Sequence, residues 1–416
     1  MKKLVIFLIG LNMCCFILAF TVNFSFPFDE WRKGPPVHYF SAYSSQNASK
    51  TFWVATACLL DLYLVLIFLF SHMVKKKREF ASKTACLVIA VTIFAGSFLV
   101  VEYATRAYIR NSPGYSRFRP HPLLFWYNRP DFSALNLSIN SSGFRYGENI
   151  PVRKPSGEYR IFVFGDSSAF GDSVGDKETF SYQLEKKLNE EYGGRKFRVI
   201  NAACPGHTTY QGLILLKQEI LKFSPDMLVI AYNNDSGLEY VEEKARSFQS
   251  SFIKKLNAVF YRSDYYLLFQ RVATNFRLFL SAKINKINAP PLVHRVSIED
   301  YKANIGEFMR ISKERGIRDV FVKMPVNLEA FKVFPFLEEL FYDESYRNAL
   351  TEICKRPGYT LVDVDANWPV KSGQGLFEIV EHNGKMGEAH FHPSSKGHQK
   401  IAEQLYDTIT QNRLIH

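Results

Sequence analysis

A serine follows a short apolar run at a place where a buried strand would give way to a helix. Residues 161–164 are apolar and lead into Gly165-Asp166-Ser167. Ligands bind at the carboxyl ends of strands in open α/β sheets, and a serine hydroxyl there becomes a nucleophile when a base and oxyanion donors converge on it. The structural alternative is that Ser167 or Ser168 only caps the following helix.

Two further loops offer groups that could hold an oxyanion. Residues 201–206 end in Gly206, which could bring a bare backbone N–H close to a ligand. The next loop contains Asn234, whose side-chain amide is a second donor. If the three strands lie in the order 2-1-3, as in flavodoxin-like sheets, these loops stand side by side. Acyl transfer needs such donors at about 2.7–3.1 Å from the forming oxyanion.

The candidate base is His392, which comes shortly before the last predicted helix. A serine hydroxyl has too high a pKa to attack unaided, so an imidazole within hydrogen-bond reach must take its proton. A metal site made of His390, His392 and His398 is the other interpretation. No fitting cysteine or carboxylate pattern accompanies it, so we expect no metal and no other cofactor.

Five short apolar runs predict strands that are buried on both faces. Helical spacing fills the gaps between them, as in Phe180, Leu184 and Leu188. This alternation predicts a flavodoxin-like three-layer domain with a mainly parallel five-stranded sheet. The stretch 236–293 breaks the alternation and reads as a helical insertion, either an ordinary one or a lid or membrane-facing surface. The strands are expected at 160–164, 197–201, 227–232, 319–324 and 361–364.

Three long apolar runs precede this domain, at about 4–22, 52–73 and 85–101. Each is close to the roughly 20 residues that a helix needs to cross a bilayer. We therefore expect a membrane region with three transmembrane helices over 1–102, a lead-in segment over 103–158 and the α/β domain over 159–416.

Lysine and arginine are concentrated between the second and third apolar runs, around residues 75–83. By the positive-inside rule this link is cytoplasmic, so the chain is expected to be an integral protein of the cytoplasmic membrane with its α/β domain in the periplasm or its equivalent. The net charge of +12 comes partly from this cluster and suits membrane lipids. No nucleic-acid-binding module is present, so nucleic acid is not expected as a partner. Only Cys204 and Cys354 lie in the outer domain, either paired or as free thiols.

Taken together, the motifs resemble the SGNH (GDSL-like) hydrolase superfamily, in its membrane-anchored bacterial type. The similarity extends from about Tyr127 to the C-terminus and includes a lead-in at 139–145. It implies that Ser167 is the nucleophile and His392 its base, with an oxyanion hole formed by the Ser167 and Gly206 N–H groups and the Asn234 side chain. The matching blocks are residues 160–171, 201–206, Asn234-Asp235, and His392-Pro393 with Gly397.

Two positions depart from the family pattern. Tyr232 stands where the family usually has a glycine, which would narrow the pocket. Ala389 stands where the family has the aspartate that orients the histidine. Glu388 is one substitute for that aspartate, and Asp363 and Asp365 are others. A Ser-His dyad steadied by a backbone carbonyl is the remaining possibility.

The resemblance implies a membrane-anchored serine esterase or acylhydrolase. Its substrate would be an acylated glycan or lipid of the cell envelope, cleaved through an acyl-enzyme on Ser167. An alternative is an O-acyltransferase that moves acetyl groups to a surface polysaccharide. The chain lacks a multi-span acyl-donor module, so a transferase would need a membrane partner to deliver the acyl group. A further alternative is a non-catalytic glycan-binding protein on the same fold, for which Ala389 argues.

Overall fold

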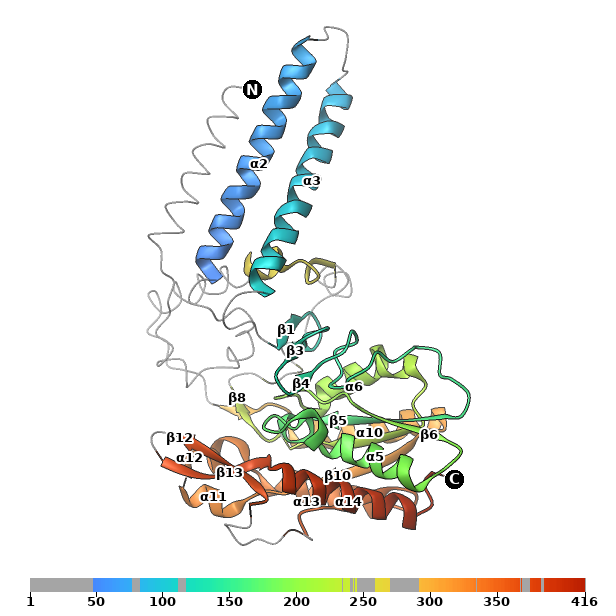
Figure 1. Cartoon of the computed structure of the whole chain (residues 1–416). Helices are drawn as coiled ribbons and strands as arrows, with labels where there is room; N and C mark the ends of the chain where they lie inside the picture. Colours follow the sequence, from blue (N-terminus) through green and yellow to red (C-terminus); the bar gives the residue numbers. More distant parts are fainter. Residues whose placement is uncertain are drawn as a thin grey trace. The chain divides into compact units, whose positions relative to one another are not determined.

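The computed structural model divides the chain into two compact units (Figure 1). The first contains Met1–Trp126 and Gln249–Ala289, and the second contains Tyr127–Phe248 and Pro290–His416. The described residues are 48–76, 83–110, 117–233, 235–239, 242, 244, 259–269, 292–333, 335–366, 368, 375–382 and 385–415.

Two long helices dominate the first unit. Helices α2 (Ala48–Lys76) and α3 (Lys83–Arg110) form over the second and third apolar runs and lie side by side, with Tyr63 packed edge-on against Phe94. Within the described part of the chain, no helix combines the length and apolarity that a membrane crossing requires. The expected span at 4–22 lies outside the described residues, so the prediction of three transmembrane helices is not supported.

A short helix at residues 264–269 is hydrogen-bonded to the carboxylate of Glu102 in α3. Glu102 accepts hydrogen bonds from the Ser263 hydroxyl at 2.7 Å and from the backbone N–H groups of Asp264 and Tyr265 at 2.8 and 3.0 Å. These are amides of a first helical turn, which have no partner inside their own helix. This helix falls within the insertion predicted over 236–293, most of which lies outside the described residues.

A parallel five-stranded sheet forms the centre of the second unit. The strand order is β11-β10-β7-β5-β6, and every neighbouring pair is parallel. The five predicted strands and the 2-1-3 order of the first three are therefore confirmed. The strands are β5 (Glu158–Gly165), β6 (Lys196–Asn201), β7 (Met227–Ala231), β10 (Arg318–Lys323) and β11 (Thr360–Asp363).

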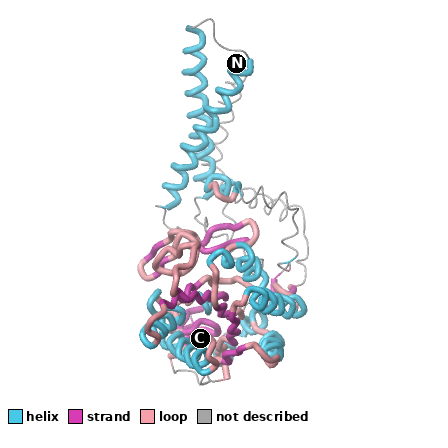
Figure 2. Tube along the Cα trace, turned by 90° about the vertical axis from the view of Figure 1, so that its right-hand side faces the viewer, coloured by secondary structure: helices cyan, strands magenta, loops and turns pink. Residues whose placement is uncertain are grey.

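Helices cover both faces of this sheet, so the three-layer prediction is confirmed (Figure 2). Helix α5 packs against α14 in one layer, and α10 packs against α6 and α13 in the other. The predicted core stripes are buried, including Leu184 and Leu405. The helices are α4 (Ser167–Phe170), α5 (Phe180–Glu191), α6 (Thr209–Gln218), α10 (Ile298–Arg315), α11 (Leu328–Val333), α12 (Pro335–Phe341), α13 (Glu344–Cys354) and α14 (Ser395–Gln411), with single turns η3 (Asp176–Glu178) and η4 (Ile220–Phe223).

Several two-stranded ladders accompany the sheet. Strands β12 (Phe377–His382) and β13 (Lys385–Pro393) form an antiparallel pair that the sequence analysis did not predict. Strands β8 (Leu238–Glu239) and β9 (Val293–His294) pair where the insertion leaves and re-enters the domain. The remaining short strands are β1 (Phe118–His121), β2 (Phe125–Asn128), β3 (Ser133–Ala134) and β4 (Leu137–Ser138). Cys204 and Cys354 are both free thiols.

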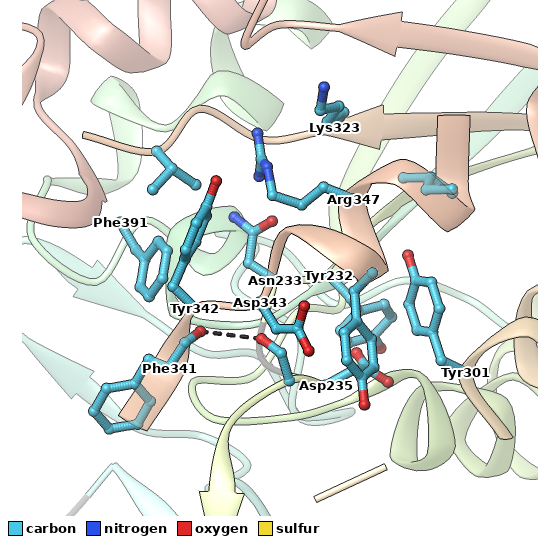
Figure 3. Close-up of a pocket in the computed structure, with 14 residues that line it drawn as sticks. Tyr232, Asn233, Asp235, Tyr301, Lys323, Phe341, Tyr342, Asp343, Arg347 and Phe391 are labelled. Atoms are coloured by element: carbon cyan, nitrogen blue, oxygen red, sulfur yellow. Dashed lines mark hydrogen bonds between the residues drawn. The ribbon is translucent and has the colours of Figure 1, made fainter. Parts of the chain in front are cut away.

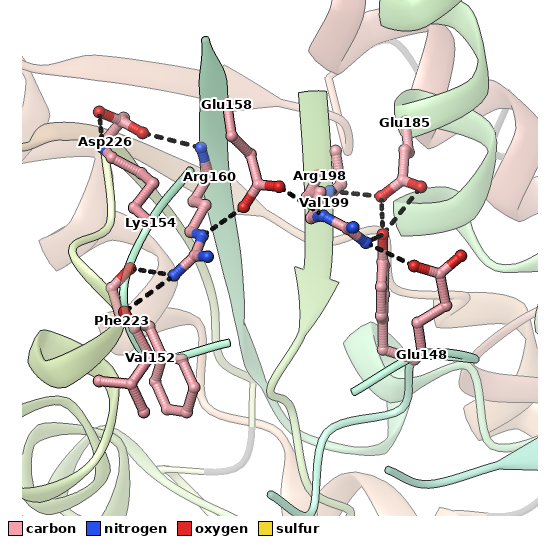
Figure 4. A network of polar contacts seen from close by, with 11 residues as sticks. Glu148, Val152, Lys154, Glu158, Arg160, Glu185, Arg198, Val199, Phe223 and Asp226 are labelled. Carbon is pink, nitrogen blue, oxygen red and sulfur yellow. Dashed lines mark hydrogen bonds and ion pairs between the residues drawn. The ribbon is translucent and has the colours of Figure 1, made fainter. Parts of the chain in front are cut away.

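A buried ion network ties the amino ends of β5 and β6 together (Figure 4). Glu158 lies between Arg160 and Arg198, at 2.6 and 2.8 Å from their guanidinium nitrogens. Arg198 also pairs with Glu148 of the lead-in at 2.9 Å. Burial alone would raise the pKa of Glu158, but the two guanidinium groups outweigh burial and lower it.

Replacing Glu158 by Gln is expected to lower the free energy of unfolding by about 3 kcal/mol at pH 7, because two guanidinium groups lose their shared buried counter-charge. A carboxylate with a lowered pKa stabilises the fold above its ordinary pKa, and this stability is lost as the pH falls through the folded-state value. The difference between wild type and Glu158→Gln should therefore shrink on acidification from pH 7 to below about 4. Denaturant unfolding at both pH values measures it.

Glu314→Gln is the matched control, since it removes an exposed partner of Arg310. It should cost less than about 1 kcal/mol. Equal losses in the two variants would mean that the buried network stabilises no more than a surface ion pair.

Candidate active site

The structure brings Ser167 and His392 together from positions 225 residues apart in the chain. The Ser167 hydroxyl oxygen lies 2.9 Å from Nε2 of His392, which is the reach that a general base needs. Ser167 opens α4 directly after β5, and His392 lies near the end of β13, just before α14. Both side chains are only partly buried, so a substrate can reach them.

The turn that presents Ser167 is capped by the preceding residue, Asp166. Asp166 is the N-cap of α4, and its Oδ1 accepts the N–H of Ser168 at 2.9 Å. The alternative in which Ser167 or Ser168 caps the helix is therefore wrong, and the Ser167 hydroxyl faces His392 instead. Gly171 ends this single turn in the left-handed conformation, with a φ of 79° that glycine adopts at little cost.

Asp166 also reaches the loop that follows β7. Its Oδ2 accepts the backbone N–H of Asn233 at 2.7 Å, so one side chain fixes two loops of the site. The residue is 1% exposed, and burial raises its pKa against the opposing effect of the Asn233 and Ser168 N–H groups and of His392.

Asn201 and Arg145 hold the other end of α4. The Asn201 amide donates to the carbonyl of Ala169 at 3.0 Å, and the Arg145 guanidinium donates to that of Phe170 at 2.9 Å. Carbonyls at the end of a helix have no partner inside it. Arg145 belongs to the lead-in, and its backbone N–H bonds to the Asn201 carbonyl at 2.9 Å. The lead-in thus helps to position the nucleophile.

Two of the three predicted oxyanion donors are backbone amides in the described part of the chain. Gly206 is buried, has a φ of 76°, and follows β6, the strand beside the one that leads to Ser167. Among the described residues, neither its N–H nor that of Ser167 has a hydrogen-bond acceptor. The third, Asn234, lies outside the described residues. Its neighbour Asp235 bonds to the Thr209 N–H at 3.1 Å, at the start of α6.

Glu388, the expected orienter of His392, is not brought to it. Its carboxylate accepts a hydrogen bond from Asn327 at 3.2 Å. Glu388 lies four residues before His392 in β13. The pairing with β12 is irregular at this point, since the partners of Glu388 and Pro393 are only two residues apart. Such bulges redirect side chains, here next to the reacting pair.

The other candidate orienters also have partners elsewhere. Asp365 pairs with Arg347 at 2.8 Å, and Asp363 pairs with Lys323 at 3.4 Å. Nδ1 of His392 has no hydrogen-bond partner among the described residues, whether a carboxylate or a backbone carbonyl. The arrangement in the described part of the chain is therefore a Ser-His dyad.

His390 and His398, the other two histidines of the metal-site interpretation, contact other protein groups. Burial and the charge of His392 lower the pKa of His390 to about 3, and its ring packs against Phe331. Burial likewise lowers the pKa of His398 to about 3, and its Nδ1 accepts the Phe180 N–H at 3.3 Å. No group of three or more potential metal ligands occurs among the described residues.

Tyr232, at the unusual position of the third block, lines a cavity at this edge of the sheet. Its ring packs closely on Gly212 of α6, where any Cβ would collide with the phenol. Gly212 therefore makes room for the tyrosine, as a close approach of this kind requires.

A nucleophile and a base at the carboxyl edge of a parallel sheet define a serine hydrolase of the α/β class. The model of the GDSL-like Lipase/Acylhydrolase family matches residues 163–400, more than half of the chain. The protein therefore belongs to this family and is a hydrolase that acts on esters. Its relation to SGNH hydrolases, expected from the sequence, is confirmed. No curated protein sequence matches the chain.

Among solved structures, similar ones include a lipase/acylhydrolase from Enterococcus faecalis, 15% identical with a TM-score of 0.38 over 61% of this chain and 96% of that one. A catalytic mutant of an acetylxylan esterase from Geobacillus stearothermophilus is 13% identical, with a TM-score of 0.36 over 60% and 94% of the two chains. A GDSL-like lipase from Bacteroides thetaiotaomicron is 12% identical, with a TM-score of 0.34 over 61% and 88%.

Asp166→Ala is expected to slow labelling of Ser167 by a fluorophosphonate probe by about 100-fold, because it releases both the α4 turn and the Asn233 loop. Asp166→Asn keeps one acceptor oxygen, so its labelling rate should lie between those of Asp166→Ala and the wild type. The measurement is the second-order rate constant of labelling.

Ser297→Ala is the matched control, because Ser297 caps α10 through the Asp300 N–H and hydrogen-bonds neither the α4 turn nor Asn233. This variant loses a helix cap comparable to the one that Asp166 provides, which lowers the free energy of unfolding by about 1 kcal/mol. If Ser297→Ala slowed labelling as much as Asp166→Ala does, general destabilisation would account for both effects.

Proposed function

We propose that the protein is a serine esterase that forms an acyl-enzyme on Ser167 and cleaves ester bonds of an acylated cell-envelope glycan or lipid. The observation that carries the proposal is the 2.9 Å contact between the Ser167 hydroxyl and Nε2 of His392. Family membership supports the ester as the bond that is broken.

In the proposed mechanism, His392 takes the hydroxyl proton while Oγ of Ser167 attacks the acyl carbonyl. The Ser167 and Gly206 N–H groups and the Asn234 side chain stabilise the oxyanion that forms. His392 then gives the proton to the departing alcohol, leaving an ester on Ser167. A water molecule attacks this ester with the same base, which releases the acid and restores the hydroxyl.

Asp166 has a supporting role in this proposal. The dyad has no carboxylate on Nδ1 of His392 in the described part of the chain, so nothing there fixes the ring tautomer as an aspartate would. The Asp166 carboxylate instead fixes the α4 turn that presents Ser167 and the backbone of Asn233. We expect this arrangement to catalyse more slowly than a complete triad.

A second candidate is a non-catalytic glycan-binding protein on the same fold. It is favoured by the buried Ala389, which leaves His392 without the family's orienting aspartate. Transfer of the acyl group to a sugar hydroxyl is a variant of the catalytic proposal, in which an acceptor replaces water. A transferase would also require a membrane partner as acyl donor.

Ser167→Ala should abolish labelling by the fluorophosphonate probe and reduce phenyl acetate hydrolysis by at least about 1,000-fold. His392→Gln should reduce both rates by about 100- to 10,000-fold, since it removes the base but keeps the nucleophile. Ser168→Ala serves as the control for a neighbouring hydroxyl and should retain activity. Folded wild-type protein that neither labels nor hydrolyses the ester would instead support the binding function.

We also propose that the chain is an integral protein of the cytoplasmic membrane with its hydrolase domain outside the cytoplasm. The support is the pattern of the sequence, in which apolar runs precede the domain and basic residues gather at 75–83. The ester substrate would then be a component of the cell envelope, and membrane lipids would surround the N-terminal region.

Full-length protein is expected to stay with the membrane fraction after an alkaline carbonate wash, because apolar segments are not released by breaking ionic contacts. Protease added outside the cytoplasmic membrane should digest the hydrolase domain while a cytoplasmic marker stays intact. Release by the wash, or protection together with the marker, would contradict this placement.

A further inference from the structure

Three loops contribute to the proposed oxyanion hole, and the one that carries Gly206 is held differently from the other two. Asp166 fixes both the turn of Ser167 and the backbone of Asn233. The side chain of Asn233 lines a cavity whose walls include neither Ser167 nor His392 (Figure 3). Among the described residues, Asp166 makes no hydrogen bond to the loop after β6. That loop therefore depends on another anchor.

The N–H of Gly206 is presented by a tight turn over residues 204–207. The His207 N–H donates to the Cys204 carbonyl at 3.0 Å, and Gly206 has a φ of 76°. A proline followed by a residue with positive φ fits a type II turn, and Pro205 stands at the required position. The Gly206 N–H takes no part in the bond that closes the turn, so its direction follows the orientation of the turn as a whole.

The peptide group that leads into this turn is held from both sides. Its N–H, from Cys204, donates to the carbonyl of Gly165 at 3.1 Å, and Gly165 lies two positions before Ser167. Its carbonyl, from Ala203, accepts a hydrogen bond from Nδ2 of Asn128 at 2.9 Å. Because a peptide group is planar, two such bonds fix its orientation. The turn is thus anchored between the strand that leads to the nucleophile and a side chain of the lead-in.

Asn128 serves only as a donor at this position. The residue is fully buried, and its Nδ2 also donates to the Gly143 carbonyl at 3.1 Å. Its Oδ1 is buried and has no hydrogen-bond partner in the described part of the chain. An unpaired buried oxygen is costly. The contribution of this side chain therefore lies in the two carbonyls that it holds.

The second acceptor connects Asn128 to the part of the lead-in that supports the nucleophile. Gly143 has a φ of 81°, and a Cβ there would collide with the ring of Tyr127. Tyr127 in turn stacks on His207, the last residue of the turn, with ring centroids 6.1 Å apart. Two positions after Gly143, Arg145 donates to a carbonyl at the end of α4. One stretch of the lead-in therefore contacts both the nucleophile turn and the oxyanion turn.

We propose that Asn128 is a positioning residue of the esterase, which holds the Ala203 carbonyl and thereby aims the Gly206 N–H at the oxyanion. Asn128 is buried and acts through the backbone of the turn rather than by contact with the substrate. This inference rests on the proposed esterase function. It adds to that function a residue of the lead-in, 39 residues before Ser167 in the sequence.

The test replaces Asn128 by Leu, which has a similar size and no donor. The value of kcat/KM for phenyl acetate should fall by about 10- to 100-fold, since a displaced oxyanion donor stabilises the transition state less. The Ki of phenylboronic acid should rise by a similar factor, because its tetrahedral adduct on serine resembles the transition state. A variant that only contained fewer folded molecules would lose apparent kcat but keep its Ki.

Asn189→Leu is the matched control. The Asn189 amide also donates to two backbone carbonyls, those of Glu185 and Phe197 at 2.8 and 2.9 Å. Phe197 lies near the amino end of β6, at the other end of the strand from the Gly206 turn. This variant should leave kcat/KM and Ki unchanged.

Hydrogen exchange of residues 202–208, measured by mass spectrometry on the full-length protein, gives a readout that needs no catalysis. Asn128→Leu should speed exchange in this segment by about tenfold, because the turn loses an anchor, whereas Asn189→Leu should not.

In an active protein, an unchanged Ki or unchanged exchange in Asn128→Leu would overturn this inference and leave the esterase function standing. A folded wild type that neither hydrolyses the ester nor binds the boronic acid would refute the esterase function. Faster exchange in Asn128→Leu would then still support Asn128 as the anchor of the turn, and unchanged exchange would refute both.

Discussion

The carboxylate of Asp166 joins parts of the site that come from separate loops. One oxygen holds the turn that starts at Ser167, and the other holds the backbone of Asn233. A buried carboxylate is costly unless its lone pairs are satisfied, and here two amides do this with charge-assisted bonds. The position of the nucleophile is therefore fixed relative to the loop that leads to Asn234. The geometry of the proposed oxyanion hole and of the adjacent cavity depends on this bridge.

Much of the α/β domain could be predicted because buried parallel strands are recognisable in a sequence. Their short apolar runs and the helical stripes between them predicted five strands and two helical layers, whereas the order of the first three strands was a hypothesis taken from flavodoxin-like sheets. The pairing of Ser167 with His392 could be expected for a similar reason. Ser167 follows a predicted strand and His392 precedes the last predicted helix. The order of the strands then places both residues at the same edge of the sheet.

Other features depend on partners that no local pattern reveals. The N-cap role of Asp166 was missed because Gly165-Asp166-Ser167 offers several capping side chains. The β12–β13 ladder was missed although Asn383-Gly384, a frequent hairpin dipeptide, stands between its strands in the sequence. Glu388 is near His392 in sequence, but in β13 its carboxylate bonds to Asn327 instead. The pairing of Lys323 with Asp363 depends on the neighbouring positions of β10 and β11.

The small ladder of β8 and β9 has a consequence for how this chain can vary. It holds residues 238–239 against 293–294, so the ends of the intervening segment meet inside the hydrolase domain whatever lies between them. The entropy of closing such a loop grows only logarithmically with its length, by about 0.6 kcal/mol for each doubling. A change in the length of this segment that spares the helix bound to Glu102 therefore costs little closure entropy, while the sheet edge that carries Ser167 keeps its geometry.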